Sequence, residues 1–157
     1  MAYTYISASL VDTDRLASEL ASVLAPGSLI ALEGDLAAGK TAFSQAFARA
    51  IGVTETVNSP TFTIIKEYEG TRFPFYHMDV YRISLMEAAE LGLEDYFYGQ
   101  GISLVEWASR IEQLLPLERL DIDIRRTNED TRVIHIQPHG TIYEEVCRQL
   151  EERGVWE

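Results

Sequence analysis

The feature that most constrains this chain is the stretch from residue 34 to residue 41. An apolar run at 29–32 predicts a buried strand before it, and Phe43, Phe47 and Ile51 predict a helix after it. A strand, a glycine-containing loop and a helix in this order direct backbone N–H groups and a helix N-terminus toward an anion. The stretch fits G-x-x-x-x-G-K-[ST], a pattern of phosphate-binding loops; its residues are Gly34, Asp35, Leu36, Ala37, Ala38, Gly39, Lys40 and Thr41.

Each part of this loop has a chemical role with a nucleotide. The amides from Asp35 to Thr41 are expected to surround the phosphates, and Lys40 adds a positive charge at the β- and γ-phosphates. The Thr41 hydroxyl is placed to ligate magnesium. The chain is therefore predicted to bind a nucleoside triphosphate with Mg²⁺. Because the sequence has no N-K-x-D motif to read guanine, ATP is favoured over GTP.

Length and composition set the broad class. A chain of 157 residues with 46% hydrophobic residues predicts one globular domain over residues 1–157. No apolar run is long enough to cross a membrane, and the N-terminus does not resemble a secretion signal, so we expect a soluble cytoplasmic protein. The single cysteine, Cys147, excludes an internal disulfide and is expected to fill the core.

The net charge of −12 bears on partners. An acidic surface repels phosphate backbones, since non-specific nucleic-acid binding depends on Lys and Arg. The charge therefore argues against a protein that grips RNA or DNA alone. It fits either a surface that keeps the protein soluble or a protein partner with a basic face.

Alternating apolar patterns outside the loop indicate an α/β protein with the P-loop NTPase fold. We predict a mainly parallel central sheet flanked by helices, with antiparallel strands added at its edge. The expected elements are a strand at 3–10, a helix capped by Asp12 or Thr13 and ending before Pro26, strands at 62–68 and 73–81, a helix at 84–91, a strand at 102–105, an antiparallel pair at 120–125 and 132–137, and a last helix carrying Ile142, Val146 and Leu150.

Two acidic residues follow predicted strands, where ligands of such sheets bind. Asp79 follows the mostly apolar run at 75–78, and Glu106 follows the mostly apolar run at 102–105. A phosphate-loop protein needs a second oxygen ligand for magnesium and a group that orients the attacking water, and these two acids are candidates for both roles. The alternative is that each acid caps the helix that follows it.

Three further residues are candidates for the site. Thr61 lies in the loop after the nucleotide-binding helix, where a switch segment contacts the γ-phosphate in many such proteins. His77 could act as a base, but a lone histidine on a strand is more often packed and hydrogen-bonded. Trp107 could stack on a nucleotide base or fill the core, and the sequence does not separate these two roles.

Five motifs in register resemble the bacterial TsaE (YjeE) family. They cover nearly the whole chain, and one departure is Ala37, where the family usually has Gly; a methyl group fits there if φ is negative. The matching segments are 32–41 with G-D-L-G-A-G-K-T, 58–62 with S-P-T-[FY], 77–82 with H-x-D-x-Y-R, 91–97 with G-[IL]-x-[DE]-Y-F, and 104–107 with [IV]-E-W.

The resemblance implies a function and a set of partners. TsaE proteins are small ATPases required to make threonylcarbamoyladenosine in tRNAs that read A-starting codons. They act with the TsaB–TsaD heterodimer, and their ATP hydrolysis serves turnover of that complex. Strong direct binding of tRNA is not expected.

The resemblance also implies residue roles. Magnesium is assigned to Thr41 and Glu106, and catalytic or switch roles fall to Asp79 and Thr61 beside Lys40. By position, two residues outside the motifs are implied as outer contacts to the nucleotide; they are Asp12 and Arg132.

A small-molecule kinase is the alternative reading of the same loop. A kinase needs an acceptor pocket and a lid over the phosphates that is often rich in arginine. The chain has 13 basic residues and no arginine cluster beyond Arg125 and Arg126. A third class, a non-catalytic nucleotide sensor, would keep the loop but lack acids at the strand ends.

Overall fold

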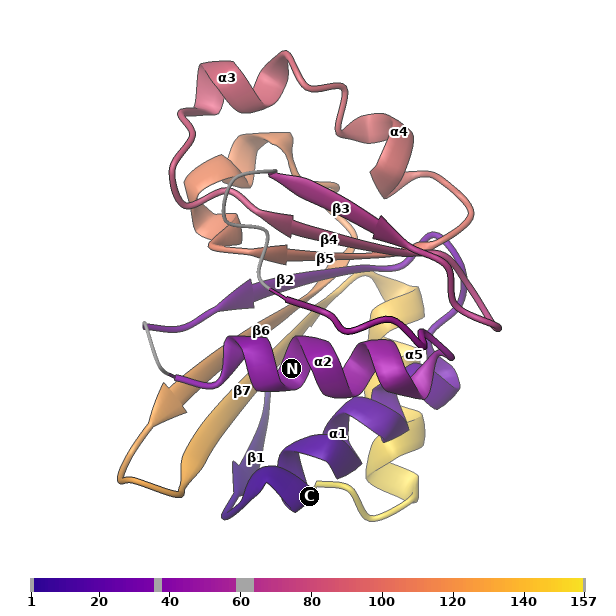
Figure 1. The fold of residues 1–157 in the computed structure, drawn as a ribbon. Coiled ribbons are helices and arrows are strands. Elements are labelled where there is room, and N and C mark those ends of the chain that lie inside the picture. The colour runs from indigo at the N-terminus through magenta and orange to yellow at the C-terminus, as the bar shows by residue number, and fades with distance from the viewer. Residues whose placement is uncertain (1, 36–37, 59–63, 157) are drawn as a thin grey trace.

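The structure is a computed structural model that describes residues 2–35, 38–58 and 64–156 (Figure 1). Strands and helices alternate over most of the chain, which is the order expected for an α/β protein. The elements are β1 (Tyr3–Ser7), α1 (Leu10–Val23), β2 (Leu29–Glu33), α2 (Lys40–Ala50), β3 (Ile65–Tyr68), β4 (Phe75–Asp79), α3 (Leu85–Ala89), α4 (Glu94–Phe97), β5 (Ile102–Glu106), the 3₁₀ helix η1 (Ala108–Leu114), β6 (Arg119–Arg126), β7 (Arg132–His139) and α5 (Thr141–Glu152).

The strands form a seven-stranded mixed sheet in the order β1-β7-β6-β2-β5-β4-β3. Neighbours from β6 to β4 run parallel, whereas β7 and β1 on one side and β3 on the other are antiparallel. The predicted fold class is confirmed. The carboxyl ends of β2, β4 and β5 therefore lie at one edge, and the loop after β2 lies there too.

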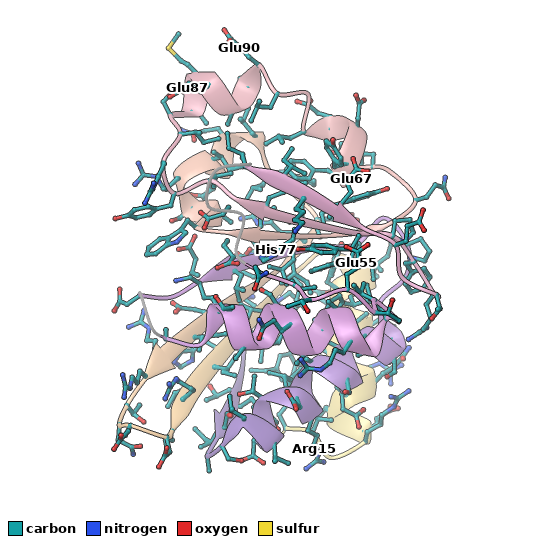
Figure 2. The ribbon with its side chains drawn as sticks, in the orientation of Figure 1. Arg15, Glu55, Glu67, His77, Glu87 and Glu90 are labelled. Atoms are coloured by element: carbon teal, nitrogen blue, oxygen red, sulfur yellow. The ribbon has the colours of Figure 1, made fainter. Side chains whose placement is uncertain are left out.

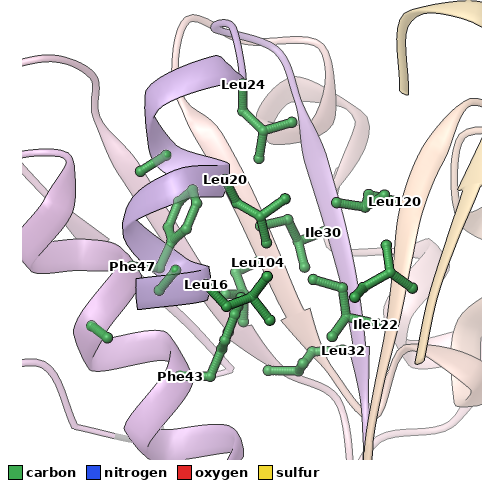
Figure 3. Packing of buried hydrophobic residues seen from close by; sticks show 14 of the residues in the cluster. Leu16, Leu20, Leu24, Ile30, Leu32, Phe43, Phe47, Leu104, Leu120 and Ile122 are labelled. Carbon is green, nitrogen blue, oxygen red and sulfur yellow. The ribbon is translucent and has the colours of Figure 1, made fainter. Parts of the chain in front are cut away.

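Helices cover both faces of the sheet. Helices α1, α2 and α5 lie on one face, and α3, α4 and η1 lie on the other (Figure 1). Figure 3 shows Leu20 of α1 and Phe47 of α2 near Ile30 of β2, all fully buried. On the opposite face Ala31 of β2 is buried in a second cluster with Met78. Because β2 is covered on both sides, its apolar residues are continuous instead of alternating.

The first helix begins earlier than the sequence pattern suggested. Ser9 is the N-cap and α1 starts at Leu10, so the prediction of a cap at Asp12 or Thr13 is wrong, as is a strand reaching residue 10. The Ser9 carbonyl accepts from the amides of Asp12 and Thr13, which draws both into the first turn. The Asp12 carboxylate then folds back and accepts from the Ala8 amide at 2.8 Å.

The last helix buries a different stripe from the one expected. Val146 and Leu150 face the core as predicted, but Ile142 is 62% exposed. Tyr143 takes the inner position, and Cys147 is fully buried, as the sequence indicated. Burial raises the pKa of the Cys147 thiol to about 12.

The other predicted elements differ mainly at their ends. The helix expected at 84–91 is α3, which ends at Ala89; its N-cap Ser84 forms a reciprocal capping box with Glu87. A separate short helix, α4, was not anticipated. The late antiparallel pair is β6 with β7, as predicted. Among the described residues, no helix has the length and apolar character needed to cross a membrane.

Candidate nucleotide-binding site

The glycine loop joins the buried strand β2 to the N-terminus of α2. Gly34 has φ of 152°, and a Cβ at this position would lie 2.6 Å from the Ile124 carbonyl oxygen of β6. Gly39, the N-cap of α2, has φ of 111°, in the region that favours glycine. The two glycines of the motif therefore allow the loop to pass closely over β6 and to enter the helix.

Lys40 is buried at the start of α2 although it is charged. Its Nζ donates to the carbonyl oxygens of Gly34 and Asp35, the latter at 3.1 Å, and it lies 4.0 Å from the centre of the Trp107 ring. Burial lowers the pKa of Lys40. Four acids oppose this shift, Glu106 most strongly, followed by Glu33, Asp79 and Asp35.

Asp79 and Glu106 lie side by side at the carboxyl ends of β4 and β5. They are register partners of adjacent parallel strands, so their side chains share one face of the sheet. Glu106 is buried and Asp79 is half-buried. Burial raises the pKa of Asp79, and the Glu106 charge raises it further, while the Tyr81 amide that donates to Asp79 Oδ1 at 3.0 Å opposes the shift.

Neither acid caps a helix. The N-cap of α3 is Ser84, and the N-cap of η1 is Trp107. The alternative structural role considered for these acids is therefore wrong. Both carboxylates are instead close enough to influence the Lys40 ammonium.

His77 is enclosed between the sheet and α2 (Figure 2). Its side chain has no exposed surface, and its ring stacks on Phe75 with ring centres 5.7 Å apart. Its Nε2 lies 2.5 Å from Oε2 of Glu106. The expectation of a packed, hydrogen-bonded histidine is confirmed, and its link to Glu106 is new.

Trp107 has an unusual backbone. Among the residues that the structure describes, Trp107 is the only non-glycine residue with a positive φ, at 61°. Bulky residues rarely adopt this left-handed conformation. The Trp107 ring contacts both the Lys40 ammonium and the Tyr81 ring, whose centre is 4.7 Å away. No sequence pattern indicates this arrangement, which places the tryptophan over the lysine of the loop.

The hairpin of β6 and β7 also reaches the loop. Arg132 Nε donates to the Ala38 carbonyl oxygen at 2.7 Å, although the two residues are 94 positions apart. A cleft of about 620 Å³ lies beside this contact, lined by Leu10, Val11, Gly39 and Arg132 among others. Asp12 lies in the first turn of α1 beside this cleft, but its carboxylate is held by the Ala8 amide.

The remaining predicted residues fall into two groups. Thr41 follows Lys40 in the first turn of α2 and is exposed, and Asp35 is exposed in the loop. Leu36, Ala37 and Thr61 lie outside the described residues. Within the described ranges, no three His, Cys, Asp or Glu side chains form a group that could hold a metal ion. A metal here would need oxygen ligands from other groups, which is usual for Mg²⁺ in phosphate-loop proteins.

The fold and the loop define a class. A sheet that is parallel in its middle carries a glycine loop at the carboxyl end of β2, and this loop leads directly into α2. Acids of the neighbouring strands β4 and β5 end at the same edge. This is the arrangement of P-loop α/β proteins, which bind ligands at the carboxyl ends of their strands.

The chain belongs to the TsaE family. The family model described as threonylcarbamoyl adenosine biosynthesis protein TsaE matches residues 7–134. The tRNA threonylcarbamoyladenosine biosynthesis protein TsaE of Bacillus subtilis is 51% identical over 139 residues, covering 88% of this chain and 87% of that protein. The protein of the same name from Treponema pallidum is 38% identical over 132 residues, covering 83% and 97%.

A solved structure agrees with this assignment. The crystal structure of YdiB from Bacillus subtilis superposes with a TM-score of 0.86 and 43% sequence identity. The superposition covers 98% of this chain and 97% of that one. The resemblance seen in the five sequence motifs is therefore confirmed, and so is the P-loop fold.

Proposed function

We propose that this protein is a Mg²⁺-dependent ATPase that supports the TsaB–TsaD complex in forming threonylcarbamoyladenosine in tRNA. The observation that carries the proposal is the meeting of Lys40, Asp79 and Glu106 at one edge of the sheet, in a member of the TsaE family. Thr41 follows Lys40 in the first turn of α2. A relative whose name gives the same biosynthesis is 51% identical over most of the chain.

Lys40 and the loop would hold the phosphates. The Lys40 Nζ lies against carbonyl oxygens of the loop, and in the nucleotide-bound protein it would contact the β- and γ-phosphates. The loop amides and the N-terminus of α2 add favourable dipoles. Together they offset charge that develops on the γ-phosphoryl group as its bond to ADP breaks.

The donor set fits magnesium. Thr41 offers a hydroxyl at the start of α2, and Glu106 offers a carboxylate on the neighbouring strand end; both are hard oxygen donors. Burial, and then the Glu106 charge, raise the pKa of Asp79, so a cation bound beside it would favour its ionised form. When bound, Mg²⁺ would neutralise charge on the phosphate oxygens.

Asp79 would orient the water that attacks the γ-phosphorus. The Tyr81 amide donates to Oδ1 and thereby restricts the rotation of the side chain. Its raised pKa makes this carboxylate a better proton acceptor than an exposed aspartate. The water supplies the new P–O bond, the bond from the γ-phosphorus to ADP breaks, and the water proton passes toward Asp79.

The cleft beside Arg132 would receive the rest of the nucleotide. It adjoins Gly39 of the loop and carries apolar side chains of Leu10 and Val11, which suit the face of a base. We expect ATP to bind better than GTP, because the chain has no guanine-reading motif. Competition between the two nucleotides for a fluorescent ATP analogue measures this preference.

The test is phosphate release from MgATP by the purified protein, alone and with TsaB–TsaD added. We expect slow hydrolysis alone and faster hydrolysis with the complex. Phosphate recovered on an organic acceptor would indicate a kinase instead. Absence of hydrolysis in both conditions, or tight binding of tRNA by this protein alone at physiological salt, would refute the proposed cycle.

A further inference from the structure

We propose that His77 is a positioning residue that holds the Glu106 carboxylate in the orientation needed for magnesium. This inference rests on the proposed function, because it concerns the metal-bound state of the same site. It concerns a residue that does not touch the nucleotide and acts only through Glu106. Three observations support it: the register of β4 and β5, the burial of both side chains, and the hydrogen-bonding state of the imidazole.

The register brings His77 to Glu106 and to no other acid at hydrogen-bonding distance among the described residues. Glu106 pairs across the strands with Asp79, and His77 lies two positions earlier on the same face of β4. His77 and Glu106 are therefore diagonal neighbours on adjacent strands, and His77 Nε2 lies 2.5 Å from Glu106 Oε2. Asp79 thus lies beside Glu106 at the carboxyl ends of the strands. His77 lies two residues before that end of β4 and contacts Glu106 from inside the sheet.

Burial makes this contact the main constraint on Glu106. The side chains of His77 and Glu106 are 0% and 3% exposed, so water cannot replace either partner. A carboxylate in such surroundings needs a donor, because an uncompensated buried charge is costly. The His77 ring is itself fixed by stacking on Phe75, which is also fully buried. The imidazole therefore cannot turn away from Glu106 without disturbing the core.

The second ring nitrogen indicates where the proton lies. Nδ1 of His77 is buried and has no hydrogen-bond partner among the described residues. An orphaned buried N–H is rarer than an orphaned acceptor, so the structure favours a bare Nδ1. A proton on Nε2 is then donated to Oε2 of Glu106. A donor at this position orients the carboxylate, as hydrogen-bonding partners of metal ligands commonly do.

Replacement of His77 should therefore weaken the binding of magnesium and leave the binding of nucleotide without metal unchanged. Partners that orient metal ligands in this way typically change metal affinity or activity by about 10–100-fold when they are replaced. His77 makes no contact with the loop or with Lys40 in the hydrogen bonds of the described residues, so affinity for the nucleotide without metal should not depend on it. A purely structural role would weaken both kinds of binding together.

The experiment compares His77→Phe with His77→Gln in the full-length protein. Phe keeps a flat ring against Phe75 but has no donor, whereas the Gln amide can still donate to Glu106. Calorimetry with ADP gives the nucleotide affinity in EDTA and at increasing Mg²⁺, and thermal unfolding confirms that each variant is folded. His77→Leu, a smaller apolar residue, serves if the Phe variant does not fold.

We expect His77→Phe to raise, by about 10–100-fold, the Mg²⁺ concentration at which the magnesium-dependent change in ADP affinity is half complete. Its affinity in EDTA should match wild type, and His77→Gln should lie close to wild type in both measurements. A wild-type magnesium midpoint in His77→Phe, or equal shifts in the Phe and Gln variants, would overturn the inference. If wild type itself shows no magnesium-dependent binding of nucleotide, the proposed function fails instead.

Discussion

Two histidine–carboxylate pairs lie in the same sheet and differ mainly in burial. In the parallel half, His77 contacts Glu106 at 2.5 Å with side chains 0% and 3% exposed. In the antiparallel half, His139 contacts Asp121 at 2.7 Å with side chains 38% and 35% exposed. Nearly equal distances therefore occur in one pair that is shielded from water and in another that is partly exposed to it.

The difference in burial decides what each pair can do. Solvent screens the exposed pair, and Arg119 Nε also donates to Asp121, at 2.8 Å, so Asp121 has a second partner. In the buried pair neither side chain has access to water, and Glu106 also influences Lys40 and Asp79. Geometry alone would rank the pairs as equals, whereas burial and the link to Lys40 and Asp79 make the buried pair the one that fits the proposed site.

The largest effect is expected from Lys40→Ala. Lys40 would donate charge-assisted hydrogen bonds to several phosphate oxygens, each worth up to about 3 kcal/mol. Because such bonds are worth about 1.5–3 kcal/mol each, loss of two corresponds to a fall in ATP affinity of about 100- to 20,000-fold. Lys66→Ala is the matched control, because Lys66 is the other lysine of the chain and lies on the edge strand β3 near Tyr68. Titration calorimetry showing unchanged ATP affinity in Lys40→Ala would refute this prediction.

Glu106→Gln should have the next largest effect. The Gln carbonyl can still accept from His77, so the buried pair keeps a hydrogen bond while the negative charge is lost. We expect turnover of MgATP to fall about 100- to 1,000-fold, since metal-ion catalysis contributes several kcal/mol to the transition state. The matched change in the exposed pair, Asp121→Asn, should leave turnover unchanged. Equal turnover in wild type and Glu106→Gln would indicate that Asp79, and not Glu106, is the magnesium ligand.

Local patterns in the sequence were enough to predict the loop and most of the sheet. The apolar run of β2, the glycine loop and the start of α2 are continuous in the chain, so each part supports the others. The carboxyl ends of β4 and β5 could also be located from the sequence, which is why Asp79 and Glu106 could be placed at the same edge of the sheet. The boundaries of α1 depended on a cap at Ser9 that competes with equally good caps at Asp12 and Thr13.

Contacts between distant residues could not be predicted in the same way. The His77–Glu106 pair joins residues 29 positions apart and depends on the register of two strands. The Arg132–Ala38 contact spans 94 positions, whereas the family resemblance implied Arg132 only as an outer contact to the nucleotide. The left-handed backbone of Trp107 has no local signal at all, because a tryptophan in this conformation is held by its surroundings.

Asp79→Asn tests whether the parallel half is less stable because of its function. The pKa of Asp79 is raised, so its ionised form is disfavoured in the folded protein. This penalty is absent below the pKa of the unfolded state, grows as pH rises through the raised pKa, and is complete above it. Asn keeps an acceptor for the Tyr81 amide, so the variant should melt at a higher temperature than wild type at pH 7.

The same variant should be a poorer enzyme. Loss of a group that orients water and accepts its proton typically costs about 100-fold or more in turnover. The expected combination is higher stability with lower activity. A melting temperature that is lower than wild type at pH 7, or a stability difference that persists at pH 3, would show that Asp79 does not carry the penalty described.

The smallest effect is expected from His139→Ala, which removes the exposed pair. Exposed ion pairs contribute up to about 1 kcal/mol, and here Asp121 keeps its bond from Arg119. We therefore expect the free energy of unfolding, measured with urea at low salt, to fall by less than about 1 kcal/mol, and by less again at 1 M NaCl because salt screens the pair. ATP affinity, magnesium dependence and turnover should remain those of wild type, in contrast to His77→Phe. If His139→Ala changed the magnesium midpoint as strongly as His77→Phe, burial would not be what distinguishes the two pairs, and the assignment of function to the parallel half would have to rest on the loop alone.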